Sequence, residues 1–216
     1  MQKRENISMS VIRRLPRYYR FLSELRRAGA VKISSKDLSE KMGLTASQIR
    51  QDFNCFGGFG QQGYGYNIPY LCDEIASILG VDEPRTCILI GAGNLGRSIA
   101  AHVPFSDLGF NLLAIFDHKE SLFGQKIHDY PILPDTHLAD FIRKEKPDMA
   151  VLCVPREPAE ELVSFLYGQG LKAFWNFSHY DIALNYPEAV VENVHLNDSM
   201  MTLRYKITEP AIHENN

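Results

Sequence analysis

Three glycines at a fixed spacing form the clearest chemical site in this 216-residue sequence. They belong to a GxGxxG turn that directly follows the apolar run at residues 86–90. In such a turn the first glycine permits a tight bend, the second lets a pyrophosphate approach the backbone, and the third allows a strand and a helix to pack closely. The N–H groups at the start of the next helix then face the phosphates. The predicted dinucleotide contacts of this turn are Gly91, Ala92, Gly93, Asn94, Leu95 and Gly96.

A carboxylate completes this pattern. Asp117 ends the next apolar run, at residues 111–116, and lies 21 residues after Gly96. At this distance an acidic side chain accepts hydrogen bonds from the adenosine ribose, and it would repel the 2′-phosphate of NADP(H). We therefore predict NAD(H) as the cofactor.

Strands and helices alternate after Asp117, which predicts a doubly wound parallel sheet. The expected helices cover residues 138–146 and 158–168, and the expected strands cover residues 149–154, 172–177 and 190–196. Ligands of such sheets bind at the carboxyl ends of the strands. Val154 and Pro155, followed by Asn176 and Phe177, are thus expected to line the nicotinamide side of the site.

The sequence contains no recognisable catalytic arrangement. His179 and His195 lack a clear orienting carboxylate, and no Ser-His-Asp order or HExxH motif is present. The four cysteines show no CxxC spacing, so we expect neither a metal site nor a disulfide framework. We predict that the protein is not an enzyme, and a small NAD-dependent oxidoreductase stays the alternative.

The elements that precede the glycine turn are basic. Residues 1–80 carry 12 Lys and Arg against 7 Asp and Glu, whereas residues 81–216 carry 11 against 19. This asymmetry indicates that only the first part meets a polyanion. An amphipathic helix is predicted over residues 11–28, with a possible start at Leu15 because Pro16 suits a first turn.

A helix-turn-helix pattern follows. Ser34 and Ser35 can cap a helix that reaches Met42, Gly43 makes the turn, and Thr45 caps a helix over residues 46–53. Glycines and aromatic residues then alternate over residues 56–66, which favours the hairpin of a winged helix. The alternative to a DNA-binding domain is a small helical module that packs on the second domain and whose arginines are only solvated. The candidate DNA contacts, with those of the second helix expected to point outward, are Ser35, Ser47, Gln48, Arg50, Gln51 and Tyr64.

Three parts are therefore predicted in an α/β chain. Residues 1–80 form a winged helix-turn-helix DNA-binding domain, residues 85–195 form a Rossmann-like NAD(H)-binding domain, and residues 196–210 form a carboxyl-terminal dimerisation helix. That last helix either folds back on its own domain or exchanges with a partner subunit. No signal peptide or membrane span is predicted, so we expect a cytoplasmic protein.

Several motifs in this order resemble those of the Rex family of redox-sensing transcriptional repressors of bacteria. They are RLPRYYR at 14–20, ISS at 33–35, QIRQD at 48–52, FGGFG at 56–60, GYGY at 63–66, GAGNLGR at 91–97, FD at 116–117, VP at 154–155 and NF at 176–177. The resemblance implies a homodimer with an exchanged carboxyl-terminal helix that binds double-stranded operator DNA. It also implies that NADH, on replacing NAD⁺, releases the operator.

The sequence departs from the family at positions that bear on the switch. His195 stands where family members commonly have an aspartate, and His102 stands where they have a tyrosine, whereas Arg14 is retained. Gln51 replaces a usual basic residue. Arg14, His102 and His195 are thus the candidates for a redox switch. A Rex-like paralogue that binds NAD(H) and DNA without redox switching is the second alternative.

Overall fold

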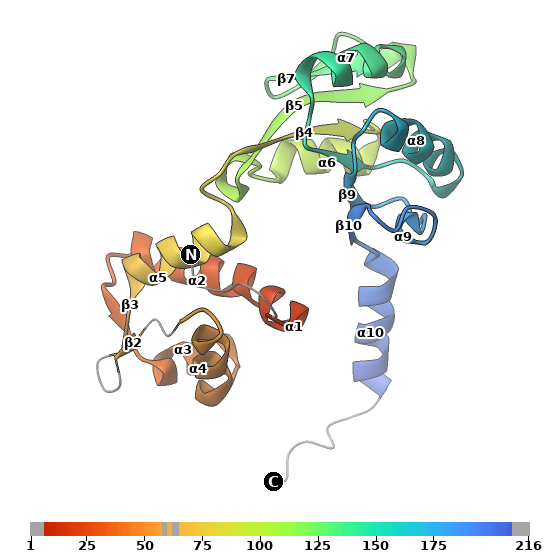
Figure 1. Cartoon of the computed structure of the whole chain (residues 1–216). Coiled ribbons are helices and arrows are strands. Elements are labelled where there is room, and N and C mark those ends of the chain that lie inside the picture. The colour runs from red at the N-terminus through yellow and green to blue at the C-terminus, as the bar shows by residue number, and fades with distance from the viewer. Residues whose placement is uncertain (1–6, 58–59, 62–64, 209–216) are drawn as a thin grey trace. The chain divides into compact units, whose positions relative to one another are not determined.

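The computed structural model describes residues 7–57, 60–61 and 65–208 of the chain (Figure 1). The chain divides into two compact units, Met1–Glu83 and Pro84–Asn216. Each unit encloses hydrophobic clusters of its own. The expected Tyr64 contact lies outside the described residues.

The first unit is a helical domain with a small sheet. Its helices pack around a core to which α2, α3, α4 and α5 all contribute. The elements of this unit are α1 (Met9–Ile12), α2 (Leu15–Arg27), β1 (Lys32–Ile33), α3 (Ser35–Met42), α4 (Ala46–Asn54), β2 (Gly60–Gln61), β3 (Gly65–Asn67) and α5 (Ile68–Leu79).

The helix expected over residues 11–28 is in fact two helices. α1 ends at Ile12, and α2 begins at Leu15 with Pro16 in its first turn. Proline has no N–H to bond the carbonyl one turn earlier, so a continuous helix through Pro16 would lose a hydrogen bond. The alternative start at Leu15 is therefore the observed one.

Local capping explains the helix-turn-helix. The Ser34 side chain accepts a hydrogen bond from Asp37 N, and the Thr45 side chain accepts one from Gln48 N. Gly43 ends α3 with φ +63°, a conformation that glycine adopts without strain. Strands β2 and β3 pair as an antiparallel hairpin, and β1 pairs with the other side of β3.

The second unit is an α/β sandwich around a seven-stranded sheet, of order β10-β9-β8-β4-β5-β7-β6. All its strand pairs are parallel except the terminal pair of β6 with β7. The strands are β4 (Arg85–Ile90), β5 (Phe110–Asp117), β6 (Lys126–Ile127), β7 (Tyr130–Pro134), β8 (Met149–Leu152), β9 (Ala173–Asn176) and β10 (Val190–Asn193). The helices are α6 (Asn94–His102), α7 (Leu138–Glu145), α8 (Arg156–Gly168), α9 (Ile182–Asn185) and α10 (Leu196–Thr208), with short 3₁₀ turns at Ser106–Leu108, Glu120–Leu122 and Asp135–His137.

Alternate residues of the buried strands face opposite layers. In β4, Ile88 and Ile90 belong to the cluster that α7 and α8 cover, whereas Cys87 and Leu89 belong to the cluster that α6 covers. Burial on both faces accounts for the nearly continuous apolar runs of β4, β5 and β8. The predicted doubly wound sheet is confirmed.

The terminal helix α10 has no buried residue. It begins at Leu196, the first residue of the expected dimerisation helix, and its last described residue is Thr208. The preceding strand β10 ends at Asn193 rather than at residue 196. In the described part of the chain, no helix is both long and apolar enough to cross a membrane.

Candidate functional site

The glycine turn joins β4 to α6 at the carboxyl end of the sheet. Gly91 has φ +100°, and a Cβ at this position would lie 2.5 Å from the carbonyl oxygen of Cys153. A Cβ on Gly96 would lie 1.8 Å from the carbonyl oxygen of Gly91. Close packing of the chain on itself therefore requires glycine at both positions.

Gly93 is glycine for a different reason. Its φ of −71° and ψ of −171° are open to any residue, and a Cβ there would meet no atom of the described chain within 4 Å. Gly93, Asn94 and Leu95 are all exposed at the amino terminus of α6. The first N–H groups of a helix have no partner within it and favour an anion. The bare backbone at Gly93 thus fits a pyrophosphate that lies against this terminus.

Asp117 fastens the glycine turn to the end of β5. The carboxylate is 6% exposed and accepts hydrogen bonds from Ala92 N, at 2.6 Å, and from Lys119 N, at 2.9 Å. A carboxylate has about four acceptor positions. Two of them remain for ribose hydroxyls, so Asp117 can hold both the turn and a nucleoside.

The crevice beside this turn is the topological switch point of the sheet. The chain continues from β4 to β5 on one side of β4, whereas the strand on the other side of β4 is β8, which comes later in the sequence. Val154 lies two residues after the end of β8, and its Cγ1 is close to the turn, 3.1 Å from where a Cβ on Gly91 would lie. Pro155 is exposed and precedes α8. Open α/β sheets bind ligands in this crevice.

The expectation for Asn176 is wrong. This side chain is fully buried, and its amide nitrogen donates to Tyr180 O and Asn193 Oδ1 at 2.8 Å. Its oxygen accepts from the backbone N–H and the hydroxyl of Ser178. These bonds join β9 to β10 and leave the amide without capacity for a ligand.

The two switch candidates of the second unit, His102 and His195, lie at opposite ends of the strands of the sheet. His102 is exposed at the carboxyl end of α6, which runs back toward the amino ends of the strands. His195 follows β10 at the carboxyl edge. Its ring stacks on His179 with centroids 4.8 Å apart, and its Nδ1 lies 3.3 Å from Asp198 Oδ2. Its Nε2 is enclosed without a hydrogen-bond partner.

Two cysteines of the second unit, Cys87 and Cys153, offer little reactive thiolate. Burial raises the pKa of the Cys87 thiol and of the Cys153 thiol to about 12. Both groups are therefore protonated at neutral pH, whereas the thiolate is the form that reacts with oxidants. Among the described residues, no group of three or more His, Cys, Asp or Glu is placed to hold a metal ion.

In the first unit, α3 and α4 position most of the candidate DNA contacts. Ser47, Arg50 and Gln51 are exposed on α4, and Arg50 Nη1 donates to Ser35 Oγ at 3.1 Å. Gln48 departs from its expected outward position. It is half-buried, and its Nε2 donates to Asp52 Oδ1 at 2.9 Å.

Asp52 is the polar centre of this unit, and the sequence interpretation named it only as part of a motif, not as a candidate site residue. The residue is 1% exposed, and Arg14 donates to it twice at 2.7 Å, from Nε to Oδ2 and from Nη2 to Oδ1. The Tyr18 hydroxyl donates to Oδ2 at 2.8 Å. Arg14, expected to take part in a switch, is thus held within its own unit. The available signal was periodicity, since Asp52 shares the inward face of α4 with Ile49 and Phe53.

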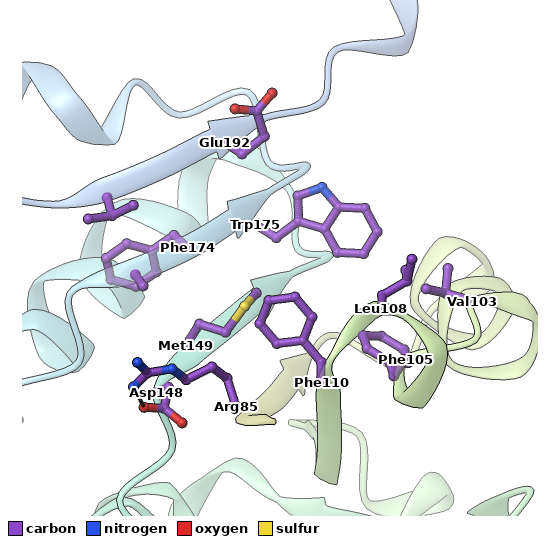
Figure 2. A pocket seen from close by; sticks show the side chains of 12 residues that line it. Arg85, Val103, Phe105, Leu108, Phe110, Asp148, Met149, Phe174, Trp175 and Glu192 are labelled. Carbon is purple, nitrogen blue, oxygen red and sulfur yellow. Dashed lines mark hydrogen bonds and ion pairs between the residues drawn. The ribbon is translucent and has the colours of Figure 1, made fainter. Parts of the chain in front are cut away.

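An apolar groove lies on the face of the sheet that α6 leaves open. It has a volume of about 700 Å³ and contains residues from the starts of β5, β8 and β10. Figure 2 shows Phe110, Met149 and Trp175 side by side along it, with the Arg85–Asp148 ion pair near one end. The remaining lining residues are Val103, Phe105, Leu108, Ala173, Phe174, Val190 and Glu192.

Two protein families match the chain. Residues 6–54 match the family described as "Putative DNA-binding protein N-terminus", and residues 82–180 match the family described as "CoA binding domain". The first match lies within the helix-turn-helix unit, and the second begins two residues before the sheet unit and otherwise lies within it.

Curated relatives match almost the whole chain. It is 49% identical over 212 residues to the redox-sensing transcriptional repressor Rex of Thermoanaerobacter pseudethanolicus, with 98% of this chain and 94% of that protein covered. It is 50% identical over 204 residues to the protein of the same name from Clostridium botulinum, with 94% and 96% covered.

Solved structures agree with this likeness. The crystal structure of RSP in complex with beta-NAD⁺ and operator DNA has a TM-score of 0.87 at 48% identity, and covers 95% of this chain and 94% of that one. The complex of RSP with beta-NADH has a TM-score of 0.84 at 45% identity, and covers 95% and 96%. RSP is described as a Rex-family repressor.

Proposed function

Because the chain belongs to the Rex family of redox-sensing transcriptional repressors, we propose that it binds operator DNA through its first unit and NAD(H) through its second. Binding of NADH in place of NAD⁺ releases the operator. One observation carries the proposal. The same chain contains a capped helix-turn-helix and a helix terminus, at Gly93 before α6, where no atom of the residues that the structure describes occupies the space that a side chain would take.

The residues of the turn support NAD(H) as the cofactor. The terminus of α6, at Gly93, Asn94 and Leu95, would hold the pyrophosphate, and Asp117 would hold the adenosine ribose. The family described as a CoA binding domain shares this half of the chain. Coenzyme A, however, carries a phosphate on its adenosine ribose, which the Asp117 carboxylate would repel. The bound nicotinamide would supply the redox signal, because its oxidised form carries a positive charge that the reduced form lacks.

The exposed residues of α4 support a DNA interface. Ser47, Arg50 and Gln51 belong to the second helix of the helix-turn-helix, which enters the major groove in proteins of this kind. Ser35, bonded to Arg50, would contact the backbone at the start of α3. We propose a cytoplasmic location, because operator DNA of bacteria lies in the cytoplasm.

Of the three switch candidates, His195 has the surroundings that best suit the role. It lies at the carboxyl edge of the sheet, where the nicotinamide is expected, and its enclosed Nε2 lacks a partner. Arg14 is bound by Asp52, and His102 lies at the other edge. We therefore assign the discrimination between NADH and NAD⁺ to His195.

The terminal helix supports a homodimer. Large apolar side chains recur along α10 and are 56–72% exposed, namely Leu196, Met200, Met201, Leu203, Tyr205 and Ile207. Leaving so many in water is costly, because a fully buried leucine or methionine gains about 1.5–3 kcal/mol. The apolar groove on the sheet is of a size to accept such a helix face. We propose that α10 of one subunit covers the groove of its partner.

The testing experiment measures the binding of the purified protein to DNA duplexes that it selects from a randomised library. We expect NADH to weaken this binding at least ten-fold relative to NAD⁺, which corresponds to a coupling free energy of about 1.4 kcal/mol. Absence of sequence-selective binding with either cofactor would contradict the proposal that the protein is a repressor.

Selective binding that NADH does not weaken would contradict only the redox response and would favour a Rex-like protein without redox switching. Oxidation of bound NADH by simple carbonyl compounds would favour the oxidoreductase.

A further inference from the structure

We propose that Asp52, a buried carboxylate, determines which base the neighbouring Gln48 recognises in the major groove. The proposal rests on the proposed function, because it requires that α4 be the helix that reads DNA. Asp52 would then be a specificity-determining residue that acts through Gln48, without touching the DNA itself.

The geometry places the two carboxylate oxygens in different environments. Oδ2 accepts hydrogen bonds from Arg14 Nε and from the Tyr18 hydroxyl. Oδ1 accepts from Arg14 Nη2 and from Gln48 Nε2. Gln48 is four residues before Asp52, so both side chains lie on one face of α4. The bond to Gln48 can therefore be changed at Oδ1 while Oδ2 keeps its partners.

The charge of Asp52 fixes the orientation of the Gln48 amide. Burial acts to raise the pKa of the Asp52 carboxyl, but hydrogen bonds from Arg14, Tyr18 and Gln48 outweigh burial, and the pKa lies below its usual value. An ionised carboxylate only accepts hydrogen bonds. The NH₂ group of Gln48 must therefore face Asp52, and its carbonyl oxygen must face away.

This orientation limits what Gln48 can present to DNA. Gln48 is the third residue of α4, and the amino-terminal residues of a recognition helix contact base edges. Thr45 and Gln48 have the spacing of a capping box, in which Gln48 would turn back toward the Thr45 N–H. Instead, Asp52 holds its side chain. One N–H and the carbonyl oxygen remain, which match the N7 acceptor and the N6 donor of adenine.

Replacing Asp52 by asparagine reverses the constraint. The amide of Asp52→Asn can keep its oxygen toward Arg14 Nε and Tyr18 and direct its NH₂ group to Gln48, with loss of the hydrogen bond that Oδ1 accepts from Arg14 Nη2. The Gln48 amide must then turn, so that its oxygen accepts this bond and its NH₂ group faces outward. Two outward donors match the O6 and N7 acceptors of guanine. The variant is therefore expected to exchange adenine for guanine at one position of the recognised sequence.

The experiment compares full-length variants by selection from a library of randomised DNA duplexes, followed by sequencing. At the position that Gln48 reads, the unaltered protein should prefer adenine over guanine about ten-fold. Asp52→Asn should reverse this preference, and Gln48→Met, which has no amide, should abolish it at the same position. Tyr18→Phe is the matched control, because it removes a hydrogen bond to Oδ2 and leaves Oδ1 unchanged. It should lower stability and keep the preference for adenine.

The outcomes separate this proposal from the proposed function. If the unaltered protein enriches no sequence, the DNA-binding function itself fails. If it enriches a motif that is the same in Asp52→Asn, or that Gln48→Met leaves intact, only the role of Asp52 fails.

Should Asp52→Asn not fold, NMR of the unaltered protein decides. The side-chain amide signal that disappears in Gln48→Met is assigned to Gln48. Slow exchange of one of its protons with water would support the bond to Asp52. Exchange of both protons at the rate of a free side chain would overturn the proposal.

Discussion

Two glycines of the turn lack a side chain for different reasons, one for packing of the fold and one for binding of the proposed ligand. At Gly96 an added Cβ would collide with the backbone of Gly91, whereas at Gly93 it would meet only open space. The lack of a side chain at Gly96 is thus explained by packing. At Gly93 packing gives no reason for it, and we attribute it to the proposed approach of a pyrophosphate.

We predict that Gly93→Ala weakens NADH binding at least ten-fold and leaves the melting temperature almost unchanged. The methyl group would occupy the space of the phosphate, but no atom of the described chain lies within 4 Å of it. Titration of NADH by fluorescence and thermal denaturation of the same sample measure the two effects. Gly96→Ala is the contrasting variant and should lose about 1–3 kcal/mol or more of stability through overpacking. Equal stability losses in both variants would contradict this assignment.

At the same scale, His195 is expected to affect the preference between the two cofactor forms. A carboxylate attracts the positive nicotinamide of NAD⁺ more than it attracts the neutral one of NADH, so His195→Asp should shift the affinity ratio toward NAD⁺ about three- to ten-fold. Calorimetric titration with each cofactor gives the ratio. His137→Asp makes the same substitution at an exposed position before α7, and its ratio should stay that of the unaltered protein. A ratio that is equal in all three proteins would remove His195 from the switch.

At the scale of elements, a polar contact joins α2 to α4. Arg14, which precedes α2, and Tyr18, in its first turns, both bind Asp52 of α4. Around this contact the rings of Tyr18 and Phe53 lie 4.9 Å apart, and those of Phe53 and Tyr66 lie 5.1 Å apart. The position of α4, the helix proposed to read DNA, therefore depends on a carboxylate as well as on apolar packing.

Acid should loosen this contact. Because the pKa of Asp52 is lowered in the folded state, its contribution to stability is complete above the unfolded value of about 3.9 and is lost as the pH falls through the lower folded value. Urea denaturation between pH 7 and pH 3 should show the beginning of this loss below about pH 3.9. Asp52→Asn should remove this part of the pH dependence, since its amide does not titrate in this range. A variant with the acid dependence of the unaltered protein would contradict the prediction.

Removal of Arg14 tests the same contact at neutral pH. Arg14→Met leaves the Asp52 charge without its cation and should lower the free energy of unfolding by about 2–3 kcal/mol. This is less than for a fully buried pair, because the Arg14 side chain is 29% exposed. Arg13→Met, at the neighbouring exposed position, is the control and should change the stability by less than about 0.5 kcal/mol.

At the scale of the whole molecule, α10 and the apolar groove are complementary surfaces of one chain. Leu196, Met200, Leu203 and Ile207 recur at intervals of three and four residues and so form one stripe along the helix. The groove contains Trp175, the single tryptophan of the sequence. Contact between subunits can therefore be followed at a unique fluorophore.

We predict that a chain without residues 196–216 is monomeric, whereas a chain that ends at Thr208 is a dimer. Loss of the partner helix should expose Trp175 to water and move its emission to longer wavelength. Analytical ultracentrifugation and tryptophan fluorescence measure the two effects. A dimer that survives the longer deletion, with unchanged emission, would show that α10 does not cover the groove.

Much of this architecture could be predicted because its signals are local. The spacing of Gly91 and Gly96, the caps at Ser34 and Thr45 and the apolar strands each depend on residues close in sequence. The position of Asp117 is similarly local, since a parallel sheet places the ends of neighbouring strands at one edge. The order of the two units was equally readable, since the basic helix-turn-helix pattern precedes the glycine turn in the sequence.

Only the tertiary structure decided which polar side chains are already engaged. Arg14 binds Asp52, which is 38 residues away in the sequence, and the buried Asn176 forms its amide hydrogen bonds with β10 and with the loop that follows β9. His102 and His195, both singled out by sequence, lie at opposite edges of the sheet because α6 runs against the strands. Local pattern determines where a residue lies in its helix or strand. Its partners depend on how distant segments pack, because nearly all buried polar groups form hydrogen bonds.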